Sequence, residues 1–591
     1  MTRSTVAEAK NMQGEEIVVS HVDEPDAVKV DILPDSDRRE DAFGRDSSEL
    51  PPGYFWSTRF IGSYCAIGVA FACGTGGFAL VAPILDQINN SFGEPSKDIT
   101  WVGIVYTLAQ AIVFMLAGRL SDIFGRRWFF IVGSVIGLAG SIVGATAHSI
   151  GQLIAGETLI GIAAGFQISF FWVVSEIVPM KRRFLANAGI FLWSLPTNTL
   201  GPKIAINMQN NTAVHWRGCF YYLIALNAVS VLLWYCFYFP PTFHMLHKSK
   251  TAKELLKDFD YVGLILFSAG MLLLLMGLNW GGNLYPWKSG HVIGTIVSGF
   301  VALTIFGLYE SFVPLKEPYL PVALLRNYKF AAASVWASIA AMTFYAFGLI
   351  WPQAVVKLYP GISPDESSTL AGLVTMAFVL GQMTGPFIAN WAPPKPFLIV
   401  TCYIGTALLT ALAADPLNKN LTIALLSSGN FILGAGDGVC MPMTTFPIRS
   451  QEEIGTAGGL SGSIRLTGSS IAVAMYSTIL TNRLSVTVPQ TVGPAALSAG
   501  LAPSALPDLI RTLNAGSLPN STFASNLSSS SALAIEKAYR LANSKAYQTT
   551  FLSTLGFGGL GLIIVWFTGG IDESKGDYVA GQIHRPDEEK V

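Results

Sequence analysis

Four ionisable residues interrupt long apolar runs in this sequence of 591 residues. They are Glu157 in LIAGETLIGIAAG, Lys203 in NTLGPKIAI, Asp437 in LGAGDGVCM and Arg465 in SGSIRLTGS. A charge inside an apolar membrane segment is costly, so such a residue is a functional candidate by default. A buried carboxyl group can bind and release a proton, and a buried cation can pair with it. The four residues are therefore candidates for proton coupling.

Glu157 shares one helical face with Gly161 and Gly165. Small residues mark close helix contacts, so we expect Glu157 to point toward another helix rather than toward lipid. Two interpretations stay open. Glu157 either carries a proton or is a structural residue that hydrogen-bonds to a neighbour.

Asp437 falls on a helical face with Asn430, Gly434 and Met441. Proton carriage and binding of a cationic substrate are both compatible with this polar face. Arg465 lies among Gly and Ser residues in the next apolar run. We expect it to pair with Asp437 across the C-terminal half of the protein.

Lys203 follows the pair Gly201-Pro202, which weakens helical hydrogen bonding and favours a bend. We expect its long side chain to extend toward the membrane surface. Binding of an anionic substrate and an electrostatic effect on Glu157 are the alternatives.

Glu176 and Glu310 lie near the ends of apolar runs, and solvation at the membrane surface is the expected role of both.

A substrate cavity needs aromatic surface with a few polar groups. The cavity candidates within the runs are Gln167, Phe171, Trp172, Trp193, Asn198, Tyr345, Trp351 and Gln382.

The composition decides which elements must position these residues. Hydrophobic residues make up 51% of the chain and charged residues only 13%, about half the usual share of a soluble protein. The net charge of -1 is not that of a nucleic-acid-binding protein. About 20 apolar residues are needed for one membrane-spanning helix. The sequence therefore predicts an all-α polytopic membrane protein in a lipid bilayer.

We count fourteen spans: 60–85, 100–118, 128–147, 151–175, 185–206, 219–239, 261–280, 291–313, 330–352, 370–391, 396–414, 421–446, 456–481 and 549–569.

Basic residues in the short loops indicate the orientation. They concentrate in the loops that lie on the same side as the two termini, including Arg126, Arg127, Arg182 and Arg183, so both termini are expected in the cytoplasm. The acceptor sequence for N-glycosylation begins at five positions, all on the predicted outer side: Asn89, Asn210, Asn420, Asn520 and Asn526.

Outside the spans, residues 1–55 hold 13 acidic and 6 basic residues, which predicts a disordered acidic cytoplasmic tail. Segment 483–548 is expected to be a loosely structured, glycosylated outer loop, with an ordered lid as the alternative. Residues 571–591 form a second cytoplasmic tail. The six cysteines lack metal-ligand spacing, so we expect packing thiols and no metal site.

The break between the second and third spans reads GRLSDIFGRR. Asp122 precedes Arg126 by four residues and can pair with it, while Gly118 allows close helix approach and Gly125 allows the chain to reverse. Such a clasp can hold two helix bundles together and release them when they rock. The run resembles the signature loop of the major facilitator superfamily, which predicts a gating motif of Gly118, Arg119, Asp122, Gly125, Arg126 and Arg127.

Further stretches are similar to the fungal fourteen-span trichothecene efflux pump and siderophore transporter family. They are SEIVPMKRR at 175–183, WRGCFYYLIALNA at 216–228 and GLNWGGNLYPWKSGHVI at 277–293. The resemblance implies a six-helix bundle over 56–240, two inserted spans over 241–329 and a second six-helix bundle over 330–570. It also implies alternating access to a site near the membrane midplane. The wider antiporter pattern has an arginine on the fourth span, where this chain has Glu157.

From this resemblance we expect a monomeric plasma-membrane transporter that exports hydrophobic small molecules in exchange for protons. The sequence has no phosphate-binding G-x-x-x-x-G-K-[ST] loop and no catalytic motif, so we expect a proton gradient as the energy source, no cofactor and no enzymatic activity. Proton-coupled import of an iron–siderophore chelate is the alternative. A nutrient sensor built on a transporter fold is the third hypothesis.

Overall fold

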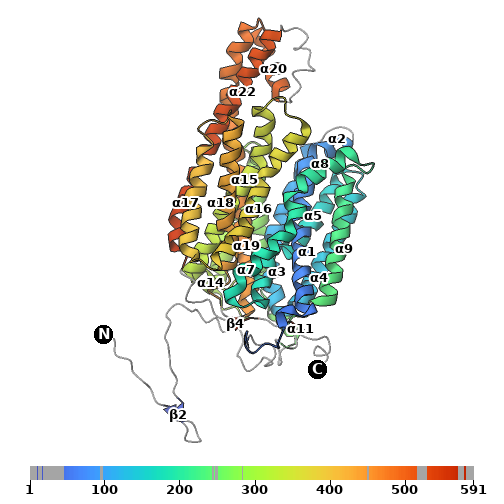
Figure 1. The fold of residues 1–591 in the computed structure, drawn as a ribbon, viewed down its shortest axis with the longest axis vertical. Coiled ribbons are helices and arrows are strands. Elements are labelled where there is room, and N and C mark those ends of the chain that lie inside the picture. Colours follow the sequence, from blue (N-terminus) through green and yellow to red (C-terminus); the bar gives the residue numbers. More distant parts are fainter. Residues whose placement is uncertain are drawn as a thin grey trace, which may run out of the picture.

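The computed structural model describes residues 9–10, 16–17, 45–92, 97–242, 245, 251–282, 284–448, 451–514, 529–569, 578–580 and 583. Long helices run side by side through the molecule (Figure 1). Within the described residues, thirteen helices are long and apolar enough to cross a membrane. The predicted all-α membrane architecture is confirmed, with strands of only two residues each among the described elements.

The N-terminal bundle contains the first six predicted spans. Its fourth span consists of two helices that are separated at Ile168 and Ser169. The helices of this bundle are α1 (Thr58–Val81), α3 (Thr100–Phe124), α4 (Arg126–Ala145), α5 (Ile150–Gln167), α6 (Phe170–Ile177), α7 (Arg183–Ser194), α8 (Gly201–Asn211) and α9 (Arg217–Phe237), with the short α2 (Leu85–Ser91) after α1.

The predicted fifth span, 185–206, is a broken helix. Between α7 and α8 the chain forms a π-helical turn over Leu195–Thr199. Pro196 and Pro202 lie at the starts of the π turn and of α8, and neither can donate the backbone hydrogen bond that a continuous α-helix needs. This explains why the span is not one of the thirteen long helices. It agrees with the bend predicted at Gly201-Pro202.

The C-terminal bundle follows the same plan but has longer helices. Its helix α19 has 48 residues and a length of about 72 Å, which exceeds the ~30 Å apolar core of a membrane. The helices are α15 (Tyr328–Leu358), α16 (Pro364–Ala389), α17 (Pro394–Ala411), α18 (Lys419–Met443), α19 (Gln451–Ser498), α22 (Ser529–Leu552) and α23 (Thr554–Ile564).

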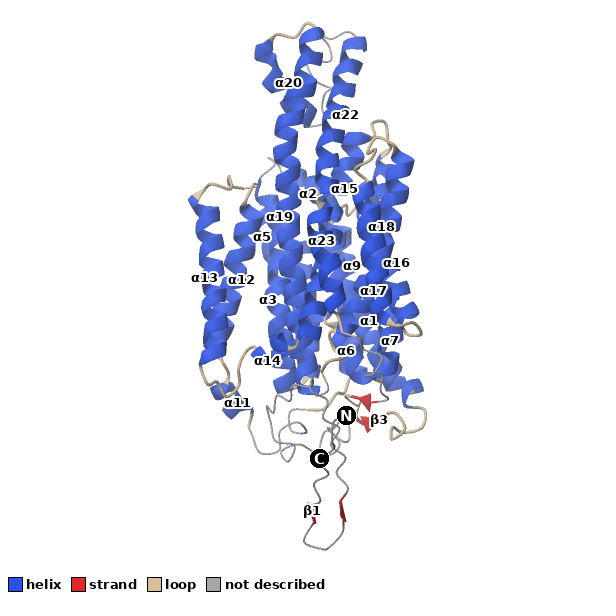
Figure 2. Ribbon diagram, turned by 90° about the vertical axis from the view of Figure 1, so that its left-hand side faces the viewer, coloured by secondary structure: helices blue, strands red, loops and turns tan. Residues whose placement is uncertain are grey.

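Helices, not a loose loop, form much of segment 483–548. The distal half of α19, α20 (Leu506–Asn514) and α22 enclose a small apolar core that includes Val492, Leu509 and Ile535. They project beyond the rest of the molecule (Figure 2). The prediction of a loosely structured loop is therefore wrong for these residues, because α19 and α22 continue past the membrane and bury apolar side chains against each other.

The two inserted spans form a helical hairpin at the side of the molecule (Figure 2). The hairpin consists of α12 (Tyr261–Trp280) and α13 (Gly290–Phe312), with the short helices α11 (Ala252–Asp258) before it and α14 (Val322–Arg326) after it. It packs against α3 of the N-terminal bundle and α19 of the C-terminal bundle.

Segments near the two ends of the chain pair at one end of the bundles. Strand β3 (Arg45–Asp46) pairs with β4 (Tyr578–Val579), and Tyr54 accepts a hydrogen bond from the backbone of Ile583 at 3.0 Å. Burial raises the pKa of Tyr54 to about 12. The predicted disordered tail is therefore wrong for residues 45–55. Strands β1 (Ala9–Lys10) and β2 (Glu16–Ile17) pair with each other. We call the end of the molecule where β3 and β4 pair the terminal end, and we call the opposite end the distal end.

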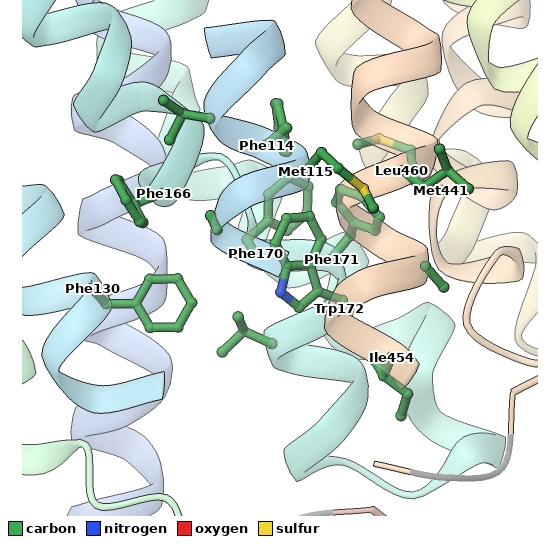
Figure 3. Packing of buried hydrophobic residues seen from close by; sticks show 14 of the residues in the cluster. Phe114, Met115, Phe130, Phe166, Phe170, Phe171, Trp172, Met441, Ile454 and Leu460 are labelled. Carbon is green, nitrogen blue, oxygen red and sulfur yellow. The ribbon is translucent and has the colours of Figure 1, made fainter. Parts of the chain in front are cut away.

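One apolar core crosses from the first bundle to the second. Phe114, Phe171 and Trp172 from the N-terminal bundle lie against Leu460 and Met441 from α19 and α18 (Figure 3). The contact between α3 and α19, which we call the seam, therefore consists of packed side chains.

Candidate functional site

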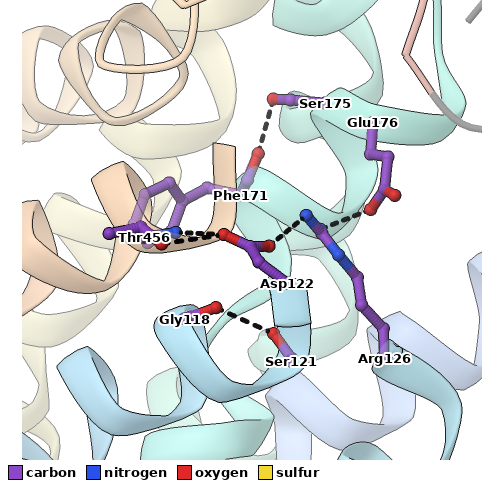
Figure 4. A network of polar contacts seen from close by, with 8 residues as sticks. All are labelled: Gly118, Ser121, Asp122, Arg126, Phe171, Ser175, Glu176 and Thr456. Carbon is purple, nitrogen blue, oxygen red and sulfur yellow. Dashed lines mark hydrogen bonds and ion pairs between the residues drawn. The ribbon is translucent and has the colours of Figure 1, made fainter. Parts of the chain in front are cut away.

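The predicted clasp is present at the terminal end of the seam (Figure 4). Arg126 Nη2 donates to Asp122 Oδ1 at 2.7 Å, and Arg126 also forms an ion pair with Glu176. All three side chains are at least 95% buried. Gly125 lies between α3 and α4 with φ of 89°, a backbone conformation that favours glycine. The i,i+4 pair expected from the sequence is confirmed.

Asp122 also joins the two bundles. Its Oδ2 accepts hydrogen bonds from the backbone nitrogen of Thr456 at 2.7 Å and from the Thr456 hydroxyl at 3.0 Å. Thr456 lies near the N-terminal end of α19, where the helix dipole favours a negative charge. A Cβ atom at Gly118 would overlap the carbonyl oxygen of Gly455. The seam is therefore closed here by a carboxylate and by direct backbone contact.

The other two arginines of the motif contact different elements. Arg119 Nη2 lies 3.2 Å from Glu317 Oε2, in the segment that leaves the inserted hairpin. Arg127 donates to the carbonyl of Tyr235 at 3.0 Å and lies over the ring of Phe239. The motif spans the end of α3 and the start of α4, and it contacts the second bundle, the segment after the hairpin and α9.

A second contact between the bundles lies at the terminal end of α7. Arg183 Nη1 donates to the carbonyl oxygen of Thr445 at 3.1 Å. The ring of Phe184 stacks on that of Phe446, with centroids 5.2 Å apart. From the sequence, Arg183 is predicted only as a basic residue of a cytoplasmic loop. Its role in this contact requires the tertiary structure.

Asp437 and Arg465 form the pair that the sequence predicted. Arg465 Nη2 lies 2.9 Å from Asp437 Oδ2, and Gln382 Nε2 donates to the same oxygen at 2.7 Å. Asp437 is fully buried, and its Oδ1 has no hydrogen-bond partner in the described part of the protein. Tyr345 faces the guanidinium group of Arg465. Two of the predicted cavity residues, Gln382 and Tyr345, therefore belong to this polar network.

Glu157 is placed differently from Asp437. It is 1% exposed, and its Oε1 has no hydrogen-bond partner among the described residues. Gly161 meets the backbone of Tyr106 on α3, as the predicted tight helix contact requires. The structural interpretation, with Glu157 bonded to a neighbour, lacks support at Oε1. A small cavity reaches the carboxyl group, lined by Gly77, Phe78, Val81, Ala82, Leu85, Val102, Gly103 and Glu157.

Lys203 lies on the exposed face of α8. Its exposure agrees with the expected extension toward the surface, and no ion pair joins it to Glu157 within the described residues. Gly201 packs against Ala79 of α1. Bending at Gly201-Pro202 therefore changes the contact between α8 and α1.

The remaining cavity candidates divide between packing and polar positions. Trp351 donates from Nε1 to the carbonyl oxygen of Leu370 at 2.7 Å and is fully buried in the C-terminal bundle. Gln167 donates to Asn227 at 2.7 Å inside the N-terminal bundle. These two side chains connect helices within one bundle. Phe171 and Trp172 pack in the seam core, whereas Trp193 and Asn198 are half-buried on α7 and the π turn.

Two expectations about surface solvation are wrong. Glu176 is 1% exposed and Glu310 is 8% exposed, because each is enclosed by neighbouring helices and loops near the terminal end. Glu176 is part of the clasp. The only available signal was its place in SEIVPMKRR, a stretch that ends in the basic residues around Arg183.

The five glycosylation candidates have different surroundings. Asn210 and Asn420 are exposed, whereas Asn89 is buried in α2. Asn520 and Asn526 lie outside the described residues. Of the cysteines, Cys236 is exposed and differs from the expected packing thiol; Cys65 is half-buried and the other four are buried.

Comparison with known proteins identifies the family of this chain. The model of the fungal trichothecene efflux pump (TRI12) family matches residues 18–590. The chain belongs to this family. Among its relatives, the trichothecene efflux pump TRI12 of Fusarium sporotrichioides is 30% identical, over 76% of this chain and 76% of the relative. The MFS-type transporter prx5 of Penicillium rubens is 26% identical, over 84% of this chain and 89% of its own length.

A solved structure supports the fold of this TRI12-family protein. The human organic anion transporter MFSD10 (TETRAN) aligns with a TM-score of 0.51 at 12% identity, over 87% of this chain and 100% of that chain. The predicted major facilitator fold is confirmed. The protein is a multi-pass membrane transporter of the major facilitator superfamily.

Proposed function

We propose that this protein exports hydrophobic small molecules of the toxin or secondary-metabolite class across a plasma membrane, in exchange for protons. The substrate class is supported by its relatives, which are named trichothecene efflux pumps. The excess of basic residues in the loops at the terminal end supports a cytoplasmic location for that end. We expect the transporter to act as a monomer with no cofactor.

The observation that carries the proton-coupling proposal is the buried carboxyl group of Glu157, whose Oε1 has no hydrogen-bond partner among the described residues. A buried carboxyl group without a cation is stabilised by binding a proton, whereas a carboxylate beside an arginine stays charged. Glu157 is therefore the proposed proton carrier. Asp437 and Arg465 provide a fixed charge pair that holds Gln382 and Tyr345 in place, and these two residues are proposed to contact the substrate.

The clasp is the proposed gate at the terminal end. Opening this end requires that Asp122 release Thr456 and that Gly118 separate from Gly455. Both contacts lie between the bundles, so rocking of one bundle against the other breaks them together. Arg126 and Glu176 hold the Asp122 side chain in place while the bundles move.

Transport in sealed inside-out vesicles tests the proposal, with a radiolabelled trichothecene as the probe. We expect accumulation when the vesicle interior is acidic and a loss of accumulation when a protonophore is added. Glu157→Gln should lose the response to the proton gradient, Asp437→Asn should keep a response, and exposed Glu366→Gln should resemble the wild type. Accumulation only in right-side-out vesicles would contradict export and favour import. A wild-type pH response in both buried variants would show that neither carboxyl group carries the proton.

A further inference from the structure

The inserted hairpin contacts both bundles along the seam. At its terminal end, Glu317 pairs with Arg119 of α3 at 3.2 Å. At its distal end, Trp287 Nε1 donates to the hydroxyl of Thr478 on α19 at 2.9 Å. The hairpin therefore touches the two elements whose separation would open the gate.

Two carboxyl groups lie together at the base of this hairpin. Asp260 caps the N-terminus of α12, where its Oδ1 accepts from Gly263 N at 2.8 Å and from the Tyr309 hydroxyl at 3.2 Å. Glu310 is in the last turn of α13, and its Oε1 accepts from Leu320 N at 2.9 Å. Both side chains are buried, with exposures of 5% and 8%.

Each carboxyl group has one satisfied oxygen and one unsatisfied oxygen. Asp260 Oδ2 and Glu310 Oε2 are buried without a hydrogen-bond donor in the described part of the chain. The two groups face each other across Gly263, where an added Cβ atom would overlap Asp260 Oδ2 and lie 3.1 Å from Glu310 Oε1. Their side chains are within hydrogen-bonding reach. A single proton placed between them satisfies both oxygens, whereas two bare carboxylates repel each other.

We propose that Asp260 and Glu310 form a binding site for one proton, separate from Glu157 and Asp437. Glu310 holds the proton and donates it in a hydrogen bond to the carboxylate of Asp260. The helix ends favour this arrangement, because an anion is stabilised at the N-terminus of α12 and destabilised at the C-terminus of α13. The surrounding ionisable groups are Tyr309, Tyr319 and the Arg119–Glu317 pair. The proton is exchanged with water at the terminal end.

The site controls the segment that holds the motif arginine. Glu310 anchors Leu320 through its backbone, three residues after Glu317. Glu317 in turn pairs with Arg119 in the gating motif. When the proton leaves, repulsion between Asp260 and Glu310 displaces this anchor and weakens the contact between Glu317 and Arg119. Protonation of the hairpin thus favours the closed terminal end.

Infrared spectroscopy of the purified full-length protein tests the site without a transport assay. The difference spectrum between about pH 5.5 and about pH 9 should contain the carbonyl stretch of a protonated carboxyl group. Glu310→Gln should remove one component of this band, a component that remains in Glu157→Gln, because the new amide donates to Asp260 in place of the shared proton. Asp260→Asn should also remove this component, because the new amide donates to Glu310 in place of the shared proton. Glu254→Gln on the exposed surface of α11 is the matched control and should keep the band.

Hydrogen exchange of segment 313–321 tests the coupling to the gate. In the wild type and in Glu254→Gln, the protection factor, which is the intrinsic exchange rate at each pH divided by the observed rate, should be lower at the alkaline pH. In Glu310→Gln the protection factor should be the same at both pH values. If neither Glu310→Gln nor Asp260→Asn removes a component of the band that Glu157→Gln retains, the proton site is overturned. Equal protection factors at both pH values in the wild type would overturn the coupling. Neither measurement depends on the proposed substrate or on the role of Glu157, so failure here is distinguishable from failure of the export proposal.

Discussion

The two bundles of this transporter handle buried charge in opposite ways. In the N-terminal bundle, the buried carboxyl group of Glu157 has an unpartnered Oε1 among the described residues, while the charges at the terminal end form the Asp122–Arg126–Glu176 network. In the C-terminal bundle, Asp437 is paired with Arg465. The same fold therefore contains one buried carboxyl group that lies in no described ion pair and one that lies beside an arginine.

The seam has the same asymmetry. The N-terminal bundle contributes ionised side chains to the clasp, whereas the C-terminal bundle contributes the backbone and hydroxyl of Thr456. A carboxylate that binds a helix end can release it without leaving a second charge unpaired. This arrangement suits a contact that must form and break in each transport cycle.

Removal of Arg465 should have the largest effect, because it leaves the Asp437 carboxyl group buried without its cation. We expect Arg465→Ala to lower the free energy of unfolding by about 3–5 kcal/mol and to abolish transport. Thermal unfolding in detergent and vesicle uptake measure the two effects. The control is Arg483→Ala, an exposed arginine on the same helix. If both variants are equally stable, the Asp437–Arg465 pair is not a structural requirement.

Glu157→Gln should change coupling more than stability, since it removes the titratable group but breaks no ion pair. We expect loss of accumulation against a gradient, retention of downhill transport, and a change in unfolding free energy of no more than about 1 kcal/mol. Counterflow of labelled trichothecene in the absence of a pH gradient measures the downhill component. If Glu157→Gln still accumulated the substrate against a gradient, Glu157 would not carry the proton, and the proposed difference in function between Glu157 and Asp437 would be wrong.

Asp122→Asn should slow turnover by about tenfold, equivalent to ~1.4 kcal/mol in the rate-limiting step. The amide oxygen can still accept from Thr456, but the ion pair with Arg126 is lost. Surface expression should remain close to that of the wild type, as measured by labelling of intact cells. Normal turnover would show that the clasp does not control switching.

Gln382→Leu should have the smallest effect on transport. It should lower the free energy of unfolding by about 1–3 kcal/mol, because it removes one hydrogen bond to a charged group and leaves the pair with Arg465. The stability change should be accompanied by altered substrate affinity, which a competition uptake assay measures. Gln353→Leu, on an exposed position of α15, is the matched control. An unchanged affinity would place Gln382 outside the substrate contact.

The sequence contained much of the site in local form. The pair of Asp122 with Arg126 follows from a spacing of four residues on a helix, and the tight contact beside Glu157 follows from its glycine neighbours. Contacts between residues that are far apart in the sequence could not be predicted from it. Thr456 lies 334 residues from Asp122, and Glu317 lies 198 residues from Arg119. No local pattern connects such residues.

By itself, the sequence determined the membrane-spanning architecture, the gating motif and the short set of buried ions, because apolar runs and helical spacing are local properties of the chain. Only the tertiary structure decided which of those ions are paired. It also showed that Glu176, Glu310 and Asp260 are enclosed rather than solvated. The physical reason is that burial and partnership depend on which helices meet, and helices distant in the chain meet only when the bundles pack.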